Sequence, residues 1–139
     1  MYEEYSRQAL PSKKYRELLG SAVCVFNSNN QFVIENILRV DDSNYNWHDL
    51  IDKTSGELSE PIKNTITKNS DTKISSLFGE LVSKRNRIIH SFQVTKNNEQ
   101  ILSTKDKKHV QYNITEDYLL AFIKDNEVLS DMLHKFRGY

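Results

Sequence analysis

The chain of 139 residues contains one cysteine, two prolines and four glycines. A single thiol excludes an internal disulfide and a zinc site made of cysteines. Cys24 lies within an apolar helical pattern, where we expect a buried and unreactive thiol. The sequence also lacks a Gly-rich loop, a His-x-x-x-His pair and an acidic cluster, so no metal, nucleotide triphosphate or other cofactor is implied.

Neither sign of charge is in excess, because 19 basic residues balance 19 acidic ones. No field of the whole molecule would therefore draw it to nucleic acid or to an anionic membrane, and any contact with RNA must be local. No apolar run approaches the roughly 20 residues needed to span a bilayer, and there is no leader of signal-peptide form. We therefore expect a cytoplasmic protein without membrane association.

What the sequence does have is three long segments in which apolar residues recur every three or four positions. This spacing predicts three amphipathic helices within a single domain spanning residues 1–139. The expected N-caps are Ser12, Asp71 and Thr115. The first helix should end near Asp41, and its phase continues through residues 27–30, which individually favour turns. One continuous helix is expected there, with two collinear helices as the alternative.

The remaining segments predict shorter elements. Asn46 should cap a short helix that buries Trp47, Leu50 and Ile51, and Met1–Leu10 forms either a short helix or an arm. Alternating apolar residues predict a β-hairpin insertion at residues 94–114, between the last two long helices. Because the three helical stripes must cover one another, the expected fold class is mainly α: an antiparallel helical bundle carrying this hairpin.

Chemically useful side chains gather in one place, the predicted central helix whose apolar stripe runs from Ile74 to Phe92. Arg85 falls near the middle of that stripe on an ideal helical wheel, although a guanidinium cannot lose its charge. Asn86 and His90 lie one turn apart on a neighbouring face, with His90 roughly 140° from Arg85. The two can share a ligand if the arginine stem reaches round, the helix distorts or two copies meet.

The sequence Arg85-Asn86-x-x-x-His90 resembles the Arg-x(4–6)-His motif of the HEPN superfamily, in which a polar residue often follows the arginine. The upstream Glu80-x-x-x-Lys84 is similar to the lead-in of some branches. The resemblance implies a small helical bundle and a metal-independent endoribonuclease, a hydrolase of the toxin–antitoxin, abortive-infection or antiviral defence type. It also implies a homodimer with a composite site, and an antitoxin or other defence protein as a further partner.

Metal-free RNA cleavage needs a proton acceptor, a cation and a proton donor. His90 suits proton transfer, because an unperturbed imidazole titrates near pH 6.5. Arg85 would clamp the scissile phosphate, and Asn86 would hold the His90 ring or donate to phosphate. These are the predicted catalytic residues. The predicted RNA-binding residues are Arg87, Lys84, Lys105, Lys107 and Lys108.

Other interpretations stay open at this point. One is that Arg85 is a structural residue paired with a carboxylate such as Glu35, and that Glu80 and Lys84 form an ordinary surface pair. A non-catalytic HEPN-like interaction module, an antitoxin or regulator, is the alternative function. One HEPN branch carries a modifiable tyrosine two residues after the histidine, whereas this chain has Phe92, which the apolar stripe explains as a packing residue. Inactivation through that hydroxyl is therefore not expected.

Overall fold

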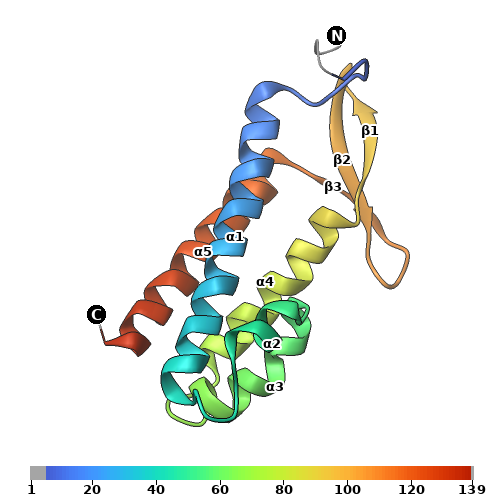
Figure 1. Cartoon of the computed structure of the whole chain (residues 1–139). Coiled ribbons are helices and arrows are strands. Elements are labelled where there is room, and N and C mark those ends of the chain that lie inside the picture. The colour runs from blue at the N-terminus through green and yellow to red at the C-terminus, as the bar shows by residue number, and fades with distance from the viewer. Residues whose placement is uncertain (1–5, 139) are drawn as a thin grey trace.

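Figure 1 shows the computed structural model of the chain, which describes residues 6–138. This part of the chain is mainly helical, as predicted, and has three long helices, α1 (Lys13–Val40), α4 (Lys73–Ile89) and α5 (Glu116–Arg137). Its shorter helical pieces are α2 (Trp47–Asp52), the 3₁₀ turn η1 (Ser55–Leu58), α3 (Ser59–Ile62) and the π-helical turn η2 (Lys63–Thr67). The expected N-terminal helix or arm lies partly outside the described residues, and residues 6–12 contain no helix.

Helix α1 is continuous, which decides between the two alternatives for residues 27–30. Ser12 caps it by accepting the Tyr15 N–H at 3.1 Å, as predicted. The polar residues in its middle form contacts between elements instead of turns. Asn29 is 5% exposed, and its side-chain amide donates to the backbone oxygen of Asn126 at 2.8 Å and to its side-chain oxygen at 3.0 Å. Such buried partners satisfy the amide within the helix.

Helices α1 and α5 run in the same direction (Figure 1). Near their first turns Lys14 lies 3.2 Å from Glu116, and near their last turns Glu35 lies 3.8 Å from Arg137. Helix α4 returns the chain the opposite way, towards the end at which α1 begins. Consecutive long helices therefore run antiparallel, as expected, and this alternation makes the first and third of them, α1 and α5, parallel to each other.

The core is built around Phe26 of α1, which is 1% exposed. Its ring stacks between Phe78 of α4 and Phe122 of α5, with centroid distances of 6.0 and 6.2 Å. Aromatic rings bury large apolar areas, and offset stacking adds specific attraction. These three rings therefore hold the three long helices together at one level.

The sheet lies between α4 and α5 in the chain and has the order β1-β2-β3, all antiparallel. Its strands are β1 (Phe92–Lys96), β2 (Glu99–Lys105) and β3 (Gln111–Ile114). The prediction of a two-stranded hairpin at residues 94–114 is therefore wrong, because the sheet has a third strand, β1, which begins at Phe92. The additional turn is Asn97-Asn98, in which both residues have positive φ, 53° and 65°. Asparagine tolerates this geometry, and it matches the twist of a two-residue hairpin.

The ends of α4 also differ from the expectation. Its N-cap is Thr72 rather than Asp71, although the Asp71 carboxylate accepts the Lys73 N–H at 2.9 Å. The helix ends at Ile89, so Phe92 belongs to a strand and is 41% exposed. The expectation that Phe92 packs in the apolar stripe of the helix is therefore wrong.

Three residues expected inside the protein are exposed. Trp47 and Ile51 of α2 are 43% and 37% exposed, so that helix buries only Leu50. Cys24 is exposed because it lies two positions from both Ala22 and Phe26, which puts it on the opposite side of α1. None of the helices within residues 6–138 has the length and apolar character required to cross a membrane.

Candidate functional site

Arg85 is half-buried on α4, and its guanidinium carbon lies 4.9 Å from the centroid of the Phe26 ring. Its Nε is shielded from solvent and has no hydrogen-bond partner among residues 6–138. Burial lowers the pKa of Arg85, although the guanidinium keeps its charge at neutral pH. The structural alternative for this residue, an ion pair with Glu35, is wrong, because Glu35 lies beside Arg137 instead.

His90 is the residue at which α4 stops. Its backbone N–H donates to the Asn86 carbonyl at 2.9 Å, and its carbonyl accepts from Thr104 Oγ1 at 3.3 Å. With φ −93° and ψ 53°, the residue leaves the helical conformation and directs the chain into β1. The backbone of His90 is thus fixed by α4 on one side and by β2 on the other, while the residue itself is exposed.

The predicted catalytic residues all line one hollow of about 380 Å³ beside the C-terminal end of α4. The residues lining it are Thr54, Gly56, Arg85, Asn86, Ile89 and His90. An ideal helix places Arg85 and His90 roughly 140° apart, yet both reach this hollow. No acidic residue is part of this lining, so its charged groups are a guanidinium and a titratable imidazole.

Within residues 6–138, the polar groups of the Arg85, Asn86 and His90 side chains form no hydrogen bond or ion pair, although the Arg85 guanidinium lies over the Phe26 ring. Asn86 therefore does not hold the His90 ring, and the two residues meet only through the backbone bond that ends the helix. Three side chains with open bonding capacity around one hollow can all address a bound anion.

The opposite wall of the hollow comes from η1, which sequence reasoning missed. Thr54 and Glu57 form a capping box, in which the Glu57 carboxylate accepts the Thr54 N–H at 2.8 Å. This bond lowers the pKa of Glu57, so its carboxylate stays ionised and tied to the cap. At Gly56 an added Cβ would meet no atom within 4 Å, so the absent side chain leaves this wall open. Nothing in the sequence pairs this segment with residues thirty positions later.

A second hollow, of about 500 Å³, lies on the other side of Asn86. It is lined by Ser83, Asn86, Arg87, Asp106, Lys107, Lys108 and Tyr112. Three of the predicted RNA-binding residues, Arg87, Lys107 and Lys108, therefore come together here. Because Asn86 lines both hollows, they are neighbours along α4.

The other two predicted RNA-binding residues lie outside both hollows. Lys84 pairs with Asp125 of α5 at 3.4 Å rather than with Glu80, so the expected pair along the helix is wrong. Lys105 is exposed, and its backbone carbonyl accepts a hydrogen bond from Arg87 Nη1. The sequence predicts that Tyr112 lies in a strand, but no local pattern predicts that it lines the second hollow.

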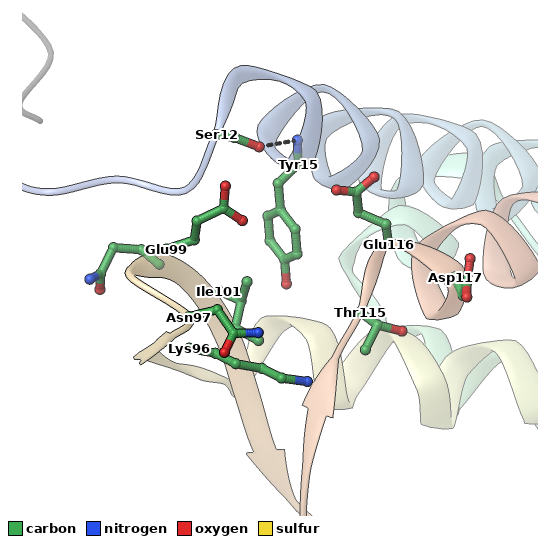
Figure 2. Close-up of a pocket in the computed structure, with 10 residues that line it drawn as sticks. Ser12, Tyr15, Lys96, Asn97, Glu99, Ile101, Thr115, Glu116 and Asp117 are labelled. Carbon is green, nitrogen blue, oxygen red and sulfur yellow. Dashed lines mark hydrogen bonds between the residues drawn. The ribbon is translucent and has the colours of Figure 1, made fainter.

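A third hollow, of about 300 Å³, lies where α1, α5 and the β1–β2 turn meet, and Figure 2 shows the residues around it. Tyr15 points from α1 towards the sheet, where its hydroxyl donates to the Ile114 carbonyl at 2.5 Å and accepts the Leu102 N–H at 3.1 Å. Burial raises the pKa of Tyr15, so the phenol stays neutral. This hydroxyl joins α1 to two strands, and its proton is already donated within the protein.

Among the described residues, no three His, Cys, Asp or Glu side chains are grouped so as to hold a metal ion. Comparison with family models, with curated proteins and with solved structures finds no match to this chain. The likeness to the HEPN motif therefore stands on the residues from Arg85 to His90, and it remains a prediction.

Proposed function

We propose that this chain is a metal-independent endoribonuclease with a HEPN-like helical bundle, acting in the cytoplasm within a toxin–antitoxin or antiphage defence system. The observation that carries the proposal is the hollow at the end of α4, in which the side chains of Arg85, Asn86 and His90 form no hydrogen bond or ion pair with the described residues. A half-buried guanidinium without a carboxylate costs stability. Groups kept in such perturbed surroundings cluster at functional sites.

The proposed reaction is attack of a ribose 2′-oxygen on the adjacent phosphorus, with loss of the 5′-oxygen of the next nucleotide. The products are a 2′,3′-cyclic phosphate and a 5′-hydroxyl, and no water enters this step. His90 accepts the 2′-hydroxyl proton, and a second histidine protonates the leaving oxygen. The Arg85 fork stabilises the charge that develops on the phosphorane oxygens, and Asn86 donates to the same group.

Two proton transfers and one suitable histidine per chain favour a homodimer in which both copies contribute. Ile89 lies on the rim of the hollow and is 53% exposed, so a second copy packed over this rim would cover an apolar side chain. In a two-fold dimer the same surface meets itself, which brings two copies of Arg85 and His90 to one seam.

The direct test uses purified protein, a mixed-sequence single-stranded RNA and EDTA. Cleavage should proceed with the chelator, give 2′,3′-cyclic phosphate ends, and fail on the same sequence carrying 2′-deoxyribose. Expression in cells should slow growth or degrade RNA. His90→Ala should abolish these effects and His48→Ala, on exposed α2, should preserve them. Undiminished cleavage by purified His90→Ala in EDTA would remove this site from the mechanism.

The dimer has its own test, in which wild-type protein and His90→Ala are unfolded and refolded together in equal amounts. If both histidines are needed, only wild-type pairs are active, and these form about one quarter of randomly assorted dimers. Independent subunits would instead retain about half of the activity. The quarter result supports the composite site, and the half result contradicts it.

The second candidate is a non-catalytic interaction module, an antitoxin or regulator. It is favoured by two exposed apolar residues one turn apart on α2, Trp47 and Ile51, since apolar side chains on one face mark binding surfaces. A stable complex with a partner protein, no RNA cleavage, and loss of the complex in Trp47→Ala would establish this function. RNA cleavage that depends on His90 would exclude it as the sole role.

A further inference from the structure

The second hollow lies between α4 and the loop that joins β2 to β3. Its volume of about 500 Å³ lies in the range of roughly 300–1,000 Å³ that small-molecule sites occupy. Its lining combines three cations, Arg87, Lys107 and Lys108, with one carboxylate, Asp106, and one aromatic ring, Tyr112. Cationic and aromatic groups therefore line this hollow together.

The loop that presents the lysines is ordered by its own hydrogen bonds. The Asp106 carboxylate accepts the backbone N–H groups of Lys108 at 2.8 Å and Val110 at 3.0 Å, and the Asp106 N–H donates to the Val110 carbonyl at 3.0 Å. Arg87 Nη1 donates to the carbonyl of Lys105, which ties the loop to α4. One oxygen of the Asp106 carboxylate therefore accepts both backbone bonds, and the three cations outnumber this single anion in the lining of the hollow.

The Tyr112 ring in the wall of the hollow packs against a second tyrosine. The Tyr112 ring lies 6.1 Å from that of Tyr118 on α5, with an interplanar angle of 46°. Burial raises the pKa of Tyr118, which therefore stays neutral. The Tyr118 ring packs beside that of Tyr112 and holds it in place at the hollow. Fixed aromatic rings beside cations are the platforms on which unpaired bases stack.

We propose that this hollow is a subsite for one unpaired nucleotide of a single-stranded RNA, its phosphate held by Lys107 and Lys108 and its base lying against Tyr112. The subsite rests on the proposed ribonuclease function, because Asn86 lines both hollows and places this nucleotide next to the phosphodiester at Arg85 and His90. A base inside a duplex is already stacked and cannot reach the ring, so the enzyme should select single strands.

The test measures binding without cleavage. A fluorescently labelled ten-nucleotide uridine or adenosine RNA is titrated with the full-length His90→Ala protein, and anisotropy is followed over a range of salt concentrations. Lys107→Ala/Lys108→Ala and Tyr112→Leu are introduced in this background. The matched control is Lys63→Ala/Lys68→Ala, which removes two exposed lysines of the η2 region. Circular dichroism and melting curves check that each variant is folded.

The lysine pair should weaken binding about 5- to 25-fold and lower the slope of log affinity against log salt by about 0.7 for each phosphate that is no longer neutralised. Tyr112→Leu should weaken binding about 5- to 100-fold, and Tyr112→Phe, which keeps the ring, should bind more tightly than the leucine variant. Because the lysines are exposed, their variants should fold even if Tyr112→Leu does not.

The outcomes separate this inference from the function on which it rests. Lysine variants that bind like the control would overturn the subsite, and cleavage by the wild-type protein that is lost in His90→Ala would leave the nuclease standing. Weakened RNA binding in these variants, with no cleavage by wild-type protein, would support the subsite and overturn the nuclease. Equal affinity for a duplex of the same length would contradict the claim that the base is unpaired.

Discussion

Replacing Arg85 with methionine should abolish RNA cleavage without destabilising the protein. Most half-buried residues are kept for stability, so a substitution that removes function and leaves or raises stability identifies a residue kept for its chemistry. Methionine fills a similar space beside the Phe26 ring, and it carries no charge and no N–H group. The stability of the variant can be worked out from the surroundings of Arg85.

Three contributions decide whether Arg85→Met raises or lowers the free energy of unfolding. The buried Nε without a partner costs about 1–3 kcal/mol, which the substitution recovers. The guanidinium 4.9 Å from the Phe26 centroid contributes about 0.5–2 kcal/mol, which the substitution removes. A sulfur beside the same ring returns about 0.3–1.5 kcal/mol. At the midpoints of these ranges the sum is a gain of about 1–2 kcal/mol in the free energy of unfolding, or about 3–6 °C in melting temperature for a chain of this size.

The assay pairs thermal unfolding followed by circular dichroism with RNA cleavage on the same samples. Arg39→Met is the control, because Arg39 is an exposed arginine in the last turn of α1. It should lose a few tenths of a kcal/mol of helix-dipole interaction and keep full cleavage. A fall of more than about 6 °C in Arg85→Met, equivalent to about 2 kcal/mol, would show that Arg85 is a structural residue and refute the reasoning.

Four further predictions concern the fold and the hollow. Tyr15→Phe should cost about 1–3 kcal/mol, because it leaves two buried backbone groups of the sheet without a partner, and urea unfolding would measure this. Asn29→Ala should cost a similar amount by stranding the side-chain oxygen of Asn126, and a double-mutant cycle with Asn126→Ala should recover part of it. Hydrogen bonds from Asn44 and Ser43 lower the pKa of Asp41 from 3.8 to about 2. The stability that this carboxylate contributes should therefore be present above about pH 4 and lost as the pH falls towards 2. The melting temperatures of Asp41→Asn and wild type should differ at pH 7 and converge towards pH 2. Gly56→Phe should block the hollow and slow cleavage with little change in melting temperature, because no atom lies within 4 Å of the added Cβ.

Local sequence patterns are sufficient for the long helices, because each helix is amphipathic over many turns and two of them, α1 and α5, begin at a capping side chain. Ser12 and Thr115 cap α1 and α5 as predicted. The strand β1 escapes prediction because Phe92 keeps the helical phase of α4 while also beginning an alternating pattern. The Asn97-Asn98 pair is the signal available in the sequence, since two asparagines between two alternating segments favour a tight hairpin.

The walls of the site depend on contacts between distant segments, which no local pattern contains. The sequence also does not show that Glu35 lies beside Arg137 and leaves Arg85 without that carboxylate. The sequence could identify Arg85, Asn86 and His90 as candidates, but only the fold brings Thr54 and Gly56 opposite them.

The most direct test of the central claim is the single-turnover rate of RNA cleavage, measured in EDTA for wild type, His90→Ala and His48→Ala. Loss of a general acid–base group should slow His90→Ala by about 10²- to 10⁴-fold, with unchanged circular dichroism, whereas His48→Ala should cleave at the wild-type rate. Equal rates for the two variants would contradict the assignment of phosphodiester chemistry to the hollow of Arg85 and His90.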